Sequence, residues 1–236
     1  MNDCIFASKL DDNAKNSLSE MGFDVIDFNK NRSVDYRVAH HADLSFFDCG
    51  DGTVFVAKEM AEYKSIIENL GYHVKIIDRQ LGRFYPNDVL LNCVSLGDIL
   101  VCNVNTVYKG ILEHFSSRKI INVKQGYTKC SVIPINNRAI ITDDESIAVK
   151  CEKCNIDVLY VHKGSVLLDG FDYGFIGGAS GKVKNDTVVF NGDIATHSDC
   201  ATLLSFFSKH NIKVVSLSNG KLKDIGSIIA FNRRYK

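Results

Sequence analysis

The sequence predicts an α/β fold in which five copies of a small strand–helix–strand unit are arranged in a closed ring. Three observations predict this fold. A short amphipathic helix recurs five times, β-branched runs flank each helix, and one strand near the C-terminal end belongs to no unit. The unit recurs about every 40 to 50 residues, a period typical of repeat folds.

Five helices are predicted from apolar residues spaced i, i+3 or i+4, and i+7, the spacing of one buried helix face. The sets are Ala14/Leu18/Met21, Met60/Tyr63/Ile67/Leu70, Val107/Ile111/Leu112, Ile147/Cys151/Cys154 and Cys200/Leu203/Leu204/Phe207. Polar residues suited to N-capping precede most of these sets: Asp11 or Asp12, Asn105, Asp144 and Ser198.

Each helix is expected to lie between two strands. The strands before the helices are 4–7, 53–56, 99–102, 139–142 and 187–190, and those after them are 24–28, 74–77, 119–123, 157–161 and 213–217. Four units have a further leading strand joined by a hairpin turn, at 43–47, 89–93, 131–135 and 173–177. The first unit lacks one, so we expect strand 225–231 to complete it and close the ring, which leaves few unpaired edges.

Composition excludes several classes of protein. Apolar residues make up 45% of the 236 residues and charged residues 24%, which is typical of a folded globular chain. Basic and acidic residues both number 28, so nonspecific nucleic-acid binding has no electrostatic basis. No apolar run is long enough for a membrane helix. With two prolines and no linker, the chain is expected to form a single domain over residues 1–236.

Eight cysteines are scattered along the chain, and no export signal precedes them. Reduced thiols and a cytoplasmic location are therefore expected. Cys151 and Cys154 form a Cys-x-x-Cys pair that could bind zinc or act in redox chemistry. Both lie on the same helix face as Ile147, and no second Cys/His pair has a ligand spacing, so core packing is favoured.

Several segments resemble the pentein superfamily, the fivefold α/β-propellers, in a bacterial branch related to guanidine-modifying enzymes. The segments are His-His-Ala-Asp at 40–43, Gln-Gly-Tyr-Thr-Lys-Cys-Ser at 125–131, Tyr-Gly-Phe-Ile-Gly-Gly-Ala-Ser-Gly at 173–181 and Asp-Ile-Gly-Ser at 224–227. Penteins include arginine and agmatine deiminases, dimethylarginine hydrolases and amidinotransferases. They also include a ribosome anti-association factor without catalysis.

The resemblance implies a hydrolase or transferase acting on a guanidino or amidine group of a small cation, without a cofactor or metal. In such enzymes a thiolate attacks the guanidinium carbon, a His acts as acid and base, and carboxylates hold the cation. It implies catalytic roles for Cys130, His41 and Asp43, since His41-x-Asp43 is similar to the His-x-Asp/Glu element. The residues assigned to substrate binding are Asp224, Asn92, Lys129, Gly177, Gly178, Ser180 and Ser227.

A non-catalytic binding protein, similar to the anti-association factor, is the alternative. In the enzymes the Cys follows the His by about three units, whereas Cys130 follows His41 by two. Lys129 predicts a lowered pKa for the Cys130 thiol, although free cysteines are also common as small buried apolar residues.

The glycine-rich segment 174–181 matches neither a P-loop nor a dinucleotide-binding fingerprint. Its glycines would let the backbone approach either a ligand or the other central strands. Asp224 is expected to be either a carboxylate at the ring centre or a solvated turn residue.

Overall fold

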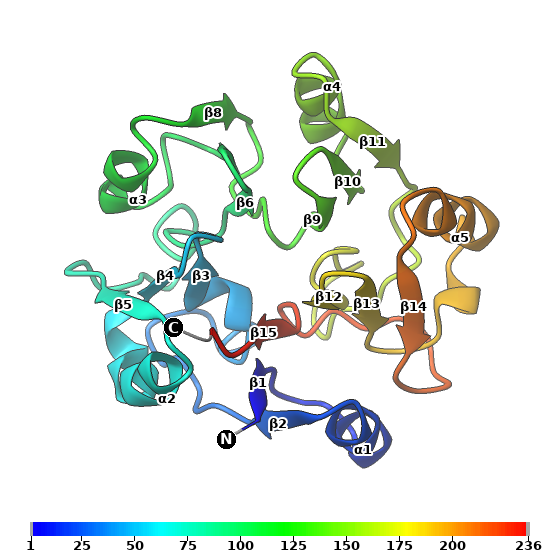
Figure 1. Ribbon diagram of the computed structural model, residues 1–236, viewed down its shortest axis with the longest axis horizontal. Coiled ribbons are helices and arrows are strands. Elements are labelled where there is room, and N and C mark those ends of the chain that lie inside the picture. Colours follow the sequence, from blue (N-terminus) through cyan, green and yellow to red (C-terminus); the bar gives the residue numbers. More distant parts are fainter. Residues whose placement is uncertain (1, 235–236) are drawn as a thin grey trace.

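The computed structural model describes residues 2–234, which form a mixed α/β fold of small sheets. Five separate three-stranded sheets have the orders β15-β1-β2, β3-β4-β5, β6-β7-β8, β9-β10-β11 and β12-β13-β14. Figure 1 shows helices α1 to α5 at the periphery, while β3, β6, β9, β12 and β15 lie nearest the middle. The sheets are not hydrogen-bonded into one continuous barrel.

The strands are β1 (Asp3–Phe6), β2 (Phe23–Ile26), β3 (Phe46–Asp48), β4 (Thr53–Val56), β5 (His73–Ile76), β6 (Val94–Leu96), β7 (Ile99–Cys102), β8 (Lys119–Asn122), β9 (Val132–Asn136), β10 (Ala139–Thr142), β11 (Asp157–Tyr160), β12 (Ser180–Lys184), β13 (Thr187–Phe190), β14 (Lys213–Ser216) and β15 (Ile229–Phe231). The α-helices are α1 (Asp12–Glu20), α2 (Lys64–Asn69), α3 (Lys109–His114), α4 (Glu145–Glu152) and α5 (Cys200–Lys209). Three 3-10 helices are η1 (Ala42–Leu44), η2 (Lys58–Tyr63) and η3 (Ile194–Thr196).

All five sheets have the same internal pairing. The middle strand pairs antiparallel with the leading strand and parallel with the strand that follows the helix. In the first sheet, Ile5 of β1 lies opposite Ala230 of β15. The C-terminal strand therefore completes the first unit, as the unassigned strand in the sequence indicated.

Four leading strands begin at least three residues later than predicted, and one of them, predicted over 225–231, is β15, which begins at Ile229. Residues 42–44 form η1 and β3 begins at Phe46, β6 begins at Val94, and the segment 173–177 contains no strand because β12 begins at Ser180. Close backbone packing explains the last difference. A Cβ on Gly177 would lie 2.5 Å from the carbonyl oxygens of both Lys129 and Val132. The polar residues assigned to the centre consequently lie mostly in turns before the strands.

Two of the predicted N-caps are present. Asp11 accepts a hydrogen bond from the Ala14 amide at 2.7 Å, and Asp144 accepts one from the Ile147 amide at 3.0 Å. The predictions for Asn105 and Ser198 are wrong, because α3 begins only at Lys109 and α5 at Cys200.

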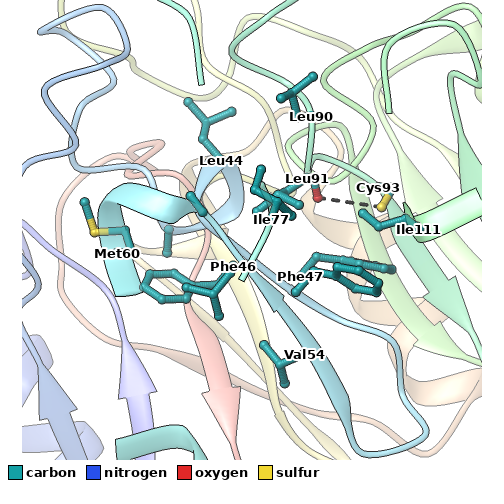
Figure 2. Packing of buried hydrophobic residues seen from close by; sticks show 14 of the residues in the cluster. Leu44, Phe46, Phe47, Val54, Met60, Ile77, Leu90, Leu91, Cys93 and Ile111 are labelled. Atoms are coloured by element: carbon teal, nitrogen blue, oxygen red, sulfur yellow. Dashed lines mark hydrogen bonds between the residues drawn. The ribbon is translucent and has the colours of Figure 1, made fainter. Parts of the chain in front are cut away.

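Apolar side chains pack on both sides of the sheets. All four residues of each of the middle strands β7, β10 and β13 are buried. Figure 2 shows successive residues of β3 pointing apart, Phe46 toward Met60 and Phe47 toward Ile111. The leading strand thus packs against its own unit through one residue and against the next unit through the other.

The cysteines are free thiols. Cys151 is fully buried on α4 and Cys154 packs partly against the same cluster, so the preference for core packing is confirmed. Among residues 2–234, no helix combines the length and the apolar character needed to cross a membrane.

Candidate functional site

A set of polar side chains from four separate segments gathers where the leading strands begin. We call it the central cluster, and its members are His41, Asp43, Asn92, Lys129, Cys130, Asp224 and Ser227. All are buried except Lys129, which is half-buried. A buried polar set of this size requires mutual hydrogen bonding to be stable, and the contacts within it are extensive.

Asn92 fixes the segment that carries Cys130. Its side-chain oxygen accepts hydrogen bonds from the backbone amides of Lys129 at 2.7 Å and Cys130 at 3.3 Å. Its Nδ2 donates to the Cys130 Sγ at 3.2 Å and to the Asp43 carbonyl at 3.1 Å. The Cys130 thiol in turn donates to Asp43 Oδ2 at 3.2 Å. Asn92 therefore orients the thiol from both its backbone and its sulfur.

Lys129 is bonded to Ser227 rather than to the thiol. Its Nζ donates to Ser227 Oγ at 2.9 Å, and that hydroxyl lies 2.7 Å from Asp43 Oδ2 and 2.9 Å from the Gly177 carbonyl. Ser227 has a φ of +69°, a left-handed conformation that non-glycine residues adopt at a cost. Packing around Ser227 therefore holds its hydroxyl beside Asp43.

Asp224 is the second buried carboxylate. Its oxygens accept hydrogen bonds from the backbone amides of Phe175 at 3.0 Å and Gly226 at 2.8 Å. His41 Nδ1 lies 4.0 Å from Asp224 Oδ1. The structure therefore places Asp224 beside His41 at the centre, and the interpretation of Asp224 as a solvated turn residue is wrong.

The glycines of segment 174–181 allow Asp224 to lie close to the backbone of that segment. A Cβ on Gly178 would lie 2.1 Å from Asp224 Oδ1, and the Gly178 amide donates to the Cys130 carbonyl at 2.9 Å. Of the two roles considered for these glycines, close packing against the other central segments is therefore the one observed. Ser180 is buried, but its hydroxyl bonds to the Gly177 carbonyl at 3.3 Å and does not reach the cluster.

Burial governs the ionisation of the cluster. Burial lowers the pKa of His41 to about 4, so its imidazole is neutral at pH 7. Burial raises the pKa of Asp224 to about 6 and also raises the pKa of Asp43. The cluster disfavours negative charge and would gain from a bound cation.

The expected lowering of the Cys130 pKa is wrong. Burial raises the pKa of this thiol well above its ordinary value, and the facing carboxylates of Asp43 and Asp224 raise it further. Because the Lys129 ammonium is bonded to Ser227 while the thiol donates to Asp43, the nearest charged partner of the sulfur is anionic.

Two cavities adjoin the central cluster and share no lining residue. The first, which we call the aromatic cavity, has a volume of about 560 Å³ and is bordered by both His41 and Cys130. Its walls carry the aromatic side chains Phe84, Tyr85, Tyr127, Phe171, Tyr173 and Phe175. Tyr127 and Phe175 stack with ring centroids 6.2 Å apart. Such walls suit a ligand with a planar cationic or apolar group.

Asp88 also lines the aromatic cavity, and the sequence interpretation missed it. It is 3% exposed, and its Oδ2 accepts a hydrogen bond from the Tyr127 hydroxyl at 2.6 Å. Its Oδ1 is buried without a partner among residues 2–234. A detectable signal was available, because Asp88 directly precedes the predicted strand 89–93.

The second cavity, which we call the lysine cavity, has a volume of about 310 Å³. It is lined by Lys129, Lys182 and Lys184, together with residues of the leading strands β3, β6, β9, β12 and β15. Lys129 therefore contacts this cavity while its neighbour Cys130 contacts the aromatic one.

One potential metal-ligand group lies elsewhere in the described chain. Ligand atoms of Cys49, Asp51 and His114 lie within 4.8 Å of one another. However, Asp51 accepts from His114 Nε2 at 2.8 Å and from Arg118, and Lys75 Nζ lies 3.4 Å from His114 Nδ1. These cationic neighbours already neutralise the carboxylate, so we assign no metal to this group.

Solved structures of several enzymes have similar folds. An agmatine deiminase from C. jejuni is 12% identical with a TM-score of 0.56, and the match covers 94% of this chain and 79% of that one. SxtG, an amidinotransferase from Microseira wollei, is 9% identical with a TM-score of 0.57, covering 94% and 78%. A DDAH from Pseudomonas aeruginosa, complexed with citrulline, is 10% identical with a TM-score of 0.52, covering 92% of both chains.

These proteins are members of the pentein superfamily, so the resemblance seen in the sequence is confirmed at the level of fold. More narrowly, the chain belongs to the family described as "Family of unknown function (DUF6873)", whose model matches residues 5–229. No protein with a curated description matches the sequence.

Proposed function

We propose that this protein acts on the guanidino or amidine group of a small cation, as a hydrolase or a transferase with Cys130 as nucleophile. The observation that carries the proposal is that His41 and Cys130 border one cavity, with the buried carboxylates of Asp43 and Asp224 beside them. The proposal includes the arrangement of the five sheets as blades of one closed ring in a single domain. The enzymatic names of the structural neighbours support the same class of substrate.

The cluster couples cation binding to formation of the nucleophile. With the ligand absent, burial and two carboxylates hold the Cys130 thiol in its protonated form. A guanidinium bound beside the sulfur would offset this negative charge and lower the pKa of the thiol. Asp43 Oδ2, which already accepts the thiol hydrogen bond, is the acceptor for that proton. The thiolate would therefore form mainly when substrate is present.

The proposed reaction proceeds in two balanced steps. The Cys130 thiolate adds to the guanidinium carbon to form a C–S bond, and a C–N bond breaks as the leaving nitrogen takes the proton that Asp43 received from the thiol. Water, or an acceptor amine in a transferase, then adds to the same carbon and the C–S bond breaks, after which the sulfur regains its proton. His41, held neutral by burial, can transfer protons between the leaving nitrogen and the incoming nucleophile.

Asp88 extends the cation site in this proposal. Its Oδ1 is buried without a hydrogen-bond donor among residues 2–234, and a guanidinium carries several N–H groups that could donate to it. The stacked rings of Tyr127 and Phe175 add cation–π attraction in the same cavity.

A non-catalytic binding protein is the second candidate. The thiol held between Asn92 and Asp43, with its raised pKa, favours this candidate because an idle cysteine needs no activation. Under this alternative the aromatic cavity would bind a cation without transforming it.

The test is a panel of guanidino compounds, measured for release of ammonia or a ureido product and for thermal stabilisation of the protein. Wild type would be compared with Cys130→Ser and His41→Gln, and with Cys154→Ser as a control thiol away from the cluster. The proposal expects turnover that both cluster variants lose and the control retains. Turnover that survives Cys130→Ser excludes this nucleophile, whereas binding without turnover in wild type favours the second candidate.

A further inference from the structure

We propose that the lysine cavity is a binding site for a small oxyanion. This inference does not depend on the reaction proposed for the aromatic cavity. It starts from an imbalance of charge among the residues that line the lysine cavity. Lys129, Lys182 and Lys184 line it, while Asp48 is the sole carboxylate among its lining residues that the structure describes. The Lys184 ammonium donates to the Met21 carbonyl at 3.2 Å and the Lys129 ammonium to Ser227, so the uncompensated charge lies mainly on Lys182.

Asp48 does not neutralise these lysines. Its Oδ1 accepts a hydrogen bond from the Gly50 amide at 2.8 Å, and the nearby cation of Arg234 acts on the same carboxylate. The carboxylate is therefore partnered at the edge of the cavity. The excess positive charge of the wall remains.

Lys182 is the clearest case of an uncompensated charge. It is half-buried on β12, and its Nζ donates to the Ile135 carbonyl at 2.5 Å. No described carboxylate lies within ion-pair distance, and Asp186 exerts only a longer-range attraction. Burial lowers the pKa of this ammonium, which reflects the cost of holding the charge there. Burying an unpaired charge is unfavourable, so a bound anion would relieve that cost.

The cavity also offers neutral donors. The side-chain amides of Asn137 and Asn185 line it, and neither makes a hydrogen bond with another side chain or backbone group in residues 2–234. Lysine and amide N–H groups together match the several acceptor oxygens of a phosphate or carboxylate. A cation, in contrast, would meet a wall in which lysines outnumber carboxylates.

Lys129 connects this cavity to the central cluster. An oxyanion paired with its ammonium would compete with the Ser227 hydroxyl, which is bonded to Asp43. Occupancy of the lysine cavity is therefore expected to change the environment of the Cys130 thiol, which donates to the same Asp43 oxygen.

The test uses inorganic phosphate as the probe, titrated into the full chain by calorimetry at constant ionic strength set with chloride. Wild type should show saturable binding. Lys182→Met, which keeps the apolar stem and removes the charge, should weaken it at least about tenfold. Lys182→Arg should retain binding. Lys213→Met, a control at an exposed lysine on β14, should leave the affinity unchanged. Methylphosphonate and succinate, compared in parallel, distinguish a phosphate-type from a carboxylate-type ligand.

Absence of saturable binding for all three anions would overturn the proposal, as would equal affinity in wild type and Lys182→Met. The unfolding temperature provides a second, independent measurement on Lys182→Met, for use if its titration is ambiguous. In chloride, Lys182→Met should change the unfolding temperature little, because removal of the unpaired charge offsets loss of the hydrogen bond to the Ile135 carbonyl. Phosphate should then raise the unfolding temperature of wild type and not that of Lys182→Met. An equal rise in both proteins would count against the site. None of these measurements requires turnover, so they stand apart from the test of the proposed reaction.

Discussion

The aromatic cavity and the lysine cavity are bordered by adjacent residues of one segment, yet their walls differ. Among the described residues, the first is aromatic, with three aspartates and two arginines, and the second contains three lysines and one aspartate. Cys130 borders the first, among aromatic rings and Asp88, whose Oδ1 has no partner among residues 2–234. Lys129 borders the second, with Lys182 and Lys184. Asn92 holds the backbone between the two residues by accepting both amide hydrogens. Two residues adjacent in sequence can therefore border cavities of different chemistry, although the Lys129 ammonium still acts on the Asp43 and Asp224 carboxylates of the central cluster.

The substitution with the greatest predicted consequence tests whether the close backbone packing behind the aromatic cavity is essential for stability. Gly178→Ala should destabilise the protein by roughly 3 to 5 kcal/mol, because its Cβ would lie 2.1 Å from Asp224 Oδ1. Gly220→Ala is the matched control, since no atom lies within 4 Å of its added Cβ. Urea unfolding measures both. Similar stability of the two variants would contradict the tight packing of Asp224 against this segment.

The second prediction concerns pH, because groups at the two cavities should affect the stability of the protein in different pH ranges. The pKa of His41 is lowered to about 4 from its ordinary value of 6.5, so the stability it contributes is complete above pH 6.5 and lost as pH falls toward 4. The raised pKa of Asp224, about 6, acts oppositely, contributing stability at low pH that is lost as pH rises through 6.

As pH falls from 7 to 4, the free energy of unfolding of His41→Gln should therefore rise by about 3 kcal/mol relative to that of wild type. Unfolding by urea at both pH values checks this, with exposed His73→Gln as control. Lys129 and Lys182, whose pKa values are lowered by burial, should instead affect stability in the alkaline range. An unchanged pH profile in His41→Gln would show that this imidazole is not held neutral.

A smaller effect tests whether Asp88 serves only the aromatic cavity. Asp88→Asn should weaken the binding of methylguanidinium about 30-fold, because a charge-assisted hydrogen bond to a buried carboxylate is lost. Calorimetry on a Cys130→Ser background measures binding without turnover. Phosphate binding in the lysine cavity should be the same with and without the substitution. Loss of both affinities together would mean that the two cavities are not independent.

The smallest effect concerns the reactivity of the thiol. Cys130 should react slowly with iodoacetamide at pH 8, since burial and the facing carboxylates raise its pKa. Asp43→Asn should accelerate the reaction about tenfold by removing one facing charge. Asp172→Asn, which changes another carboxylate of the same cavity, is the control. Mass spectrometry of the modified peptide gives the rate, and an equal rate in all three proteins would exclude Asp43 as the group that holds the thiol protonated.

The regular elements could be predicted because their signals are local. The helix containing Ile147 and Cys151, and the β-branched strands around it, follow spacings that a single segment carries by itself. Even the pairing of β15 with β1 could be predicted, because one strand belonged to no unit and the first unit lacked a leading strand.

The turns and the ionisation of the site could not be predicted in the same way. The strand expected at 89–93 is replaced by a turn in which Asn92 bonds to Lys129 and Cys130, residues distant in sequence. No local pattern encodes such a contact. The resemblance, and the positions of these residues before the predicted strands, led us to group His41, Asp43, Cys130 and Asp224. The structure places these four residues in one cluster. The adjacency of Lys129 and Cys130 nevertheless suggested the wrong partner for the thiol, because the direction of each side chain is set by tertiary packing.

The pairing of β1 with β15 also constrains the order of folding. β1 and β2 are synthesised before residues 229–231, which supply the antiparallel neighbour of β1. Contacts of such high sequence separation form slowly, since a long loop must be closed before they contribute. While the chain is still being synthesised, β1 therefore presents an open edge, the kind of surface that recruits foreign strands. A fully synthesised chain that frays should likewise release β15 first, and amide hydrogen exchange would detect that opening at Ile5 before any other sheet is disturbed.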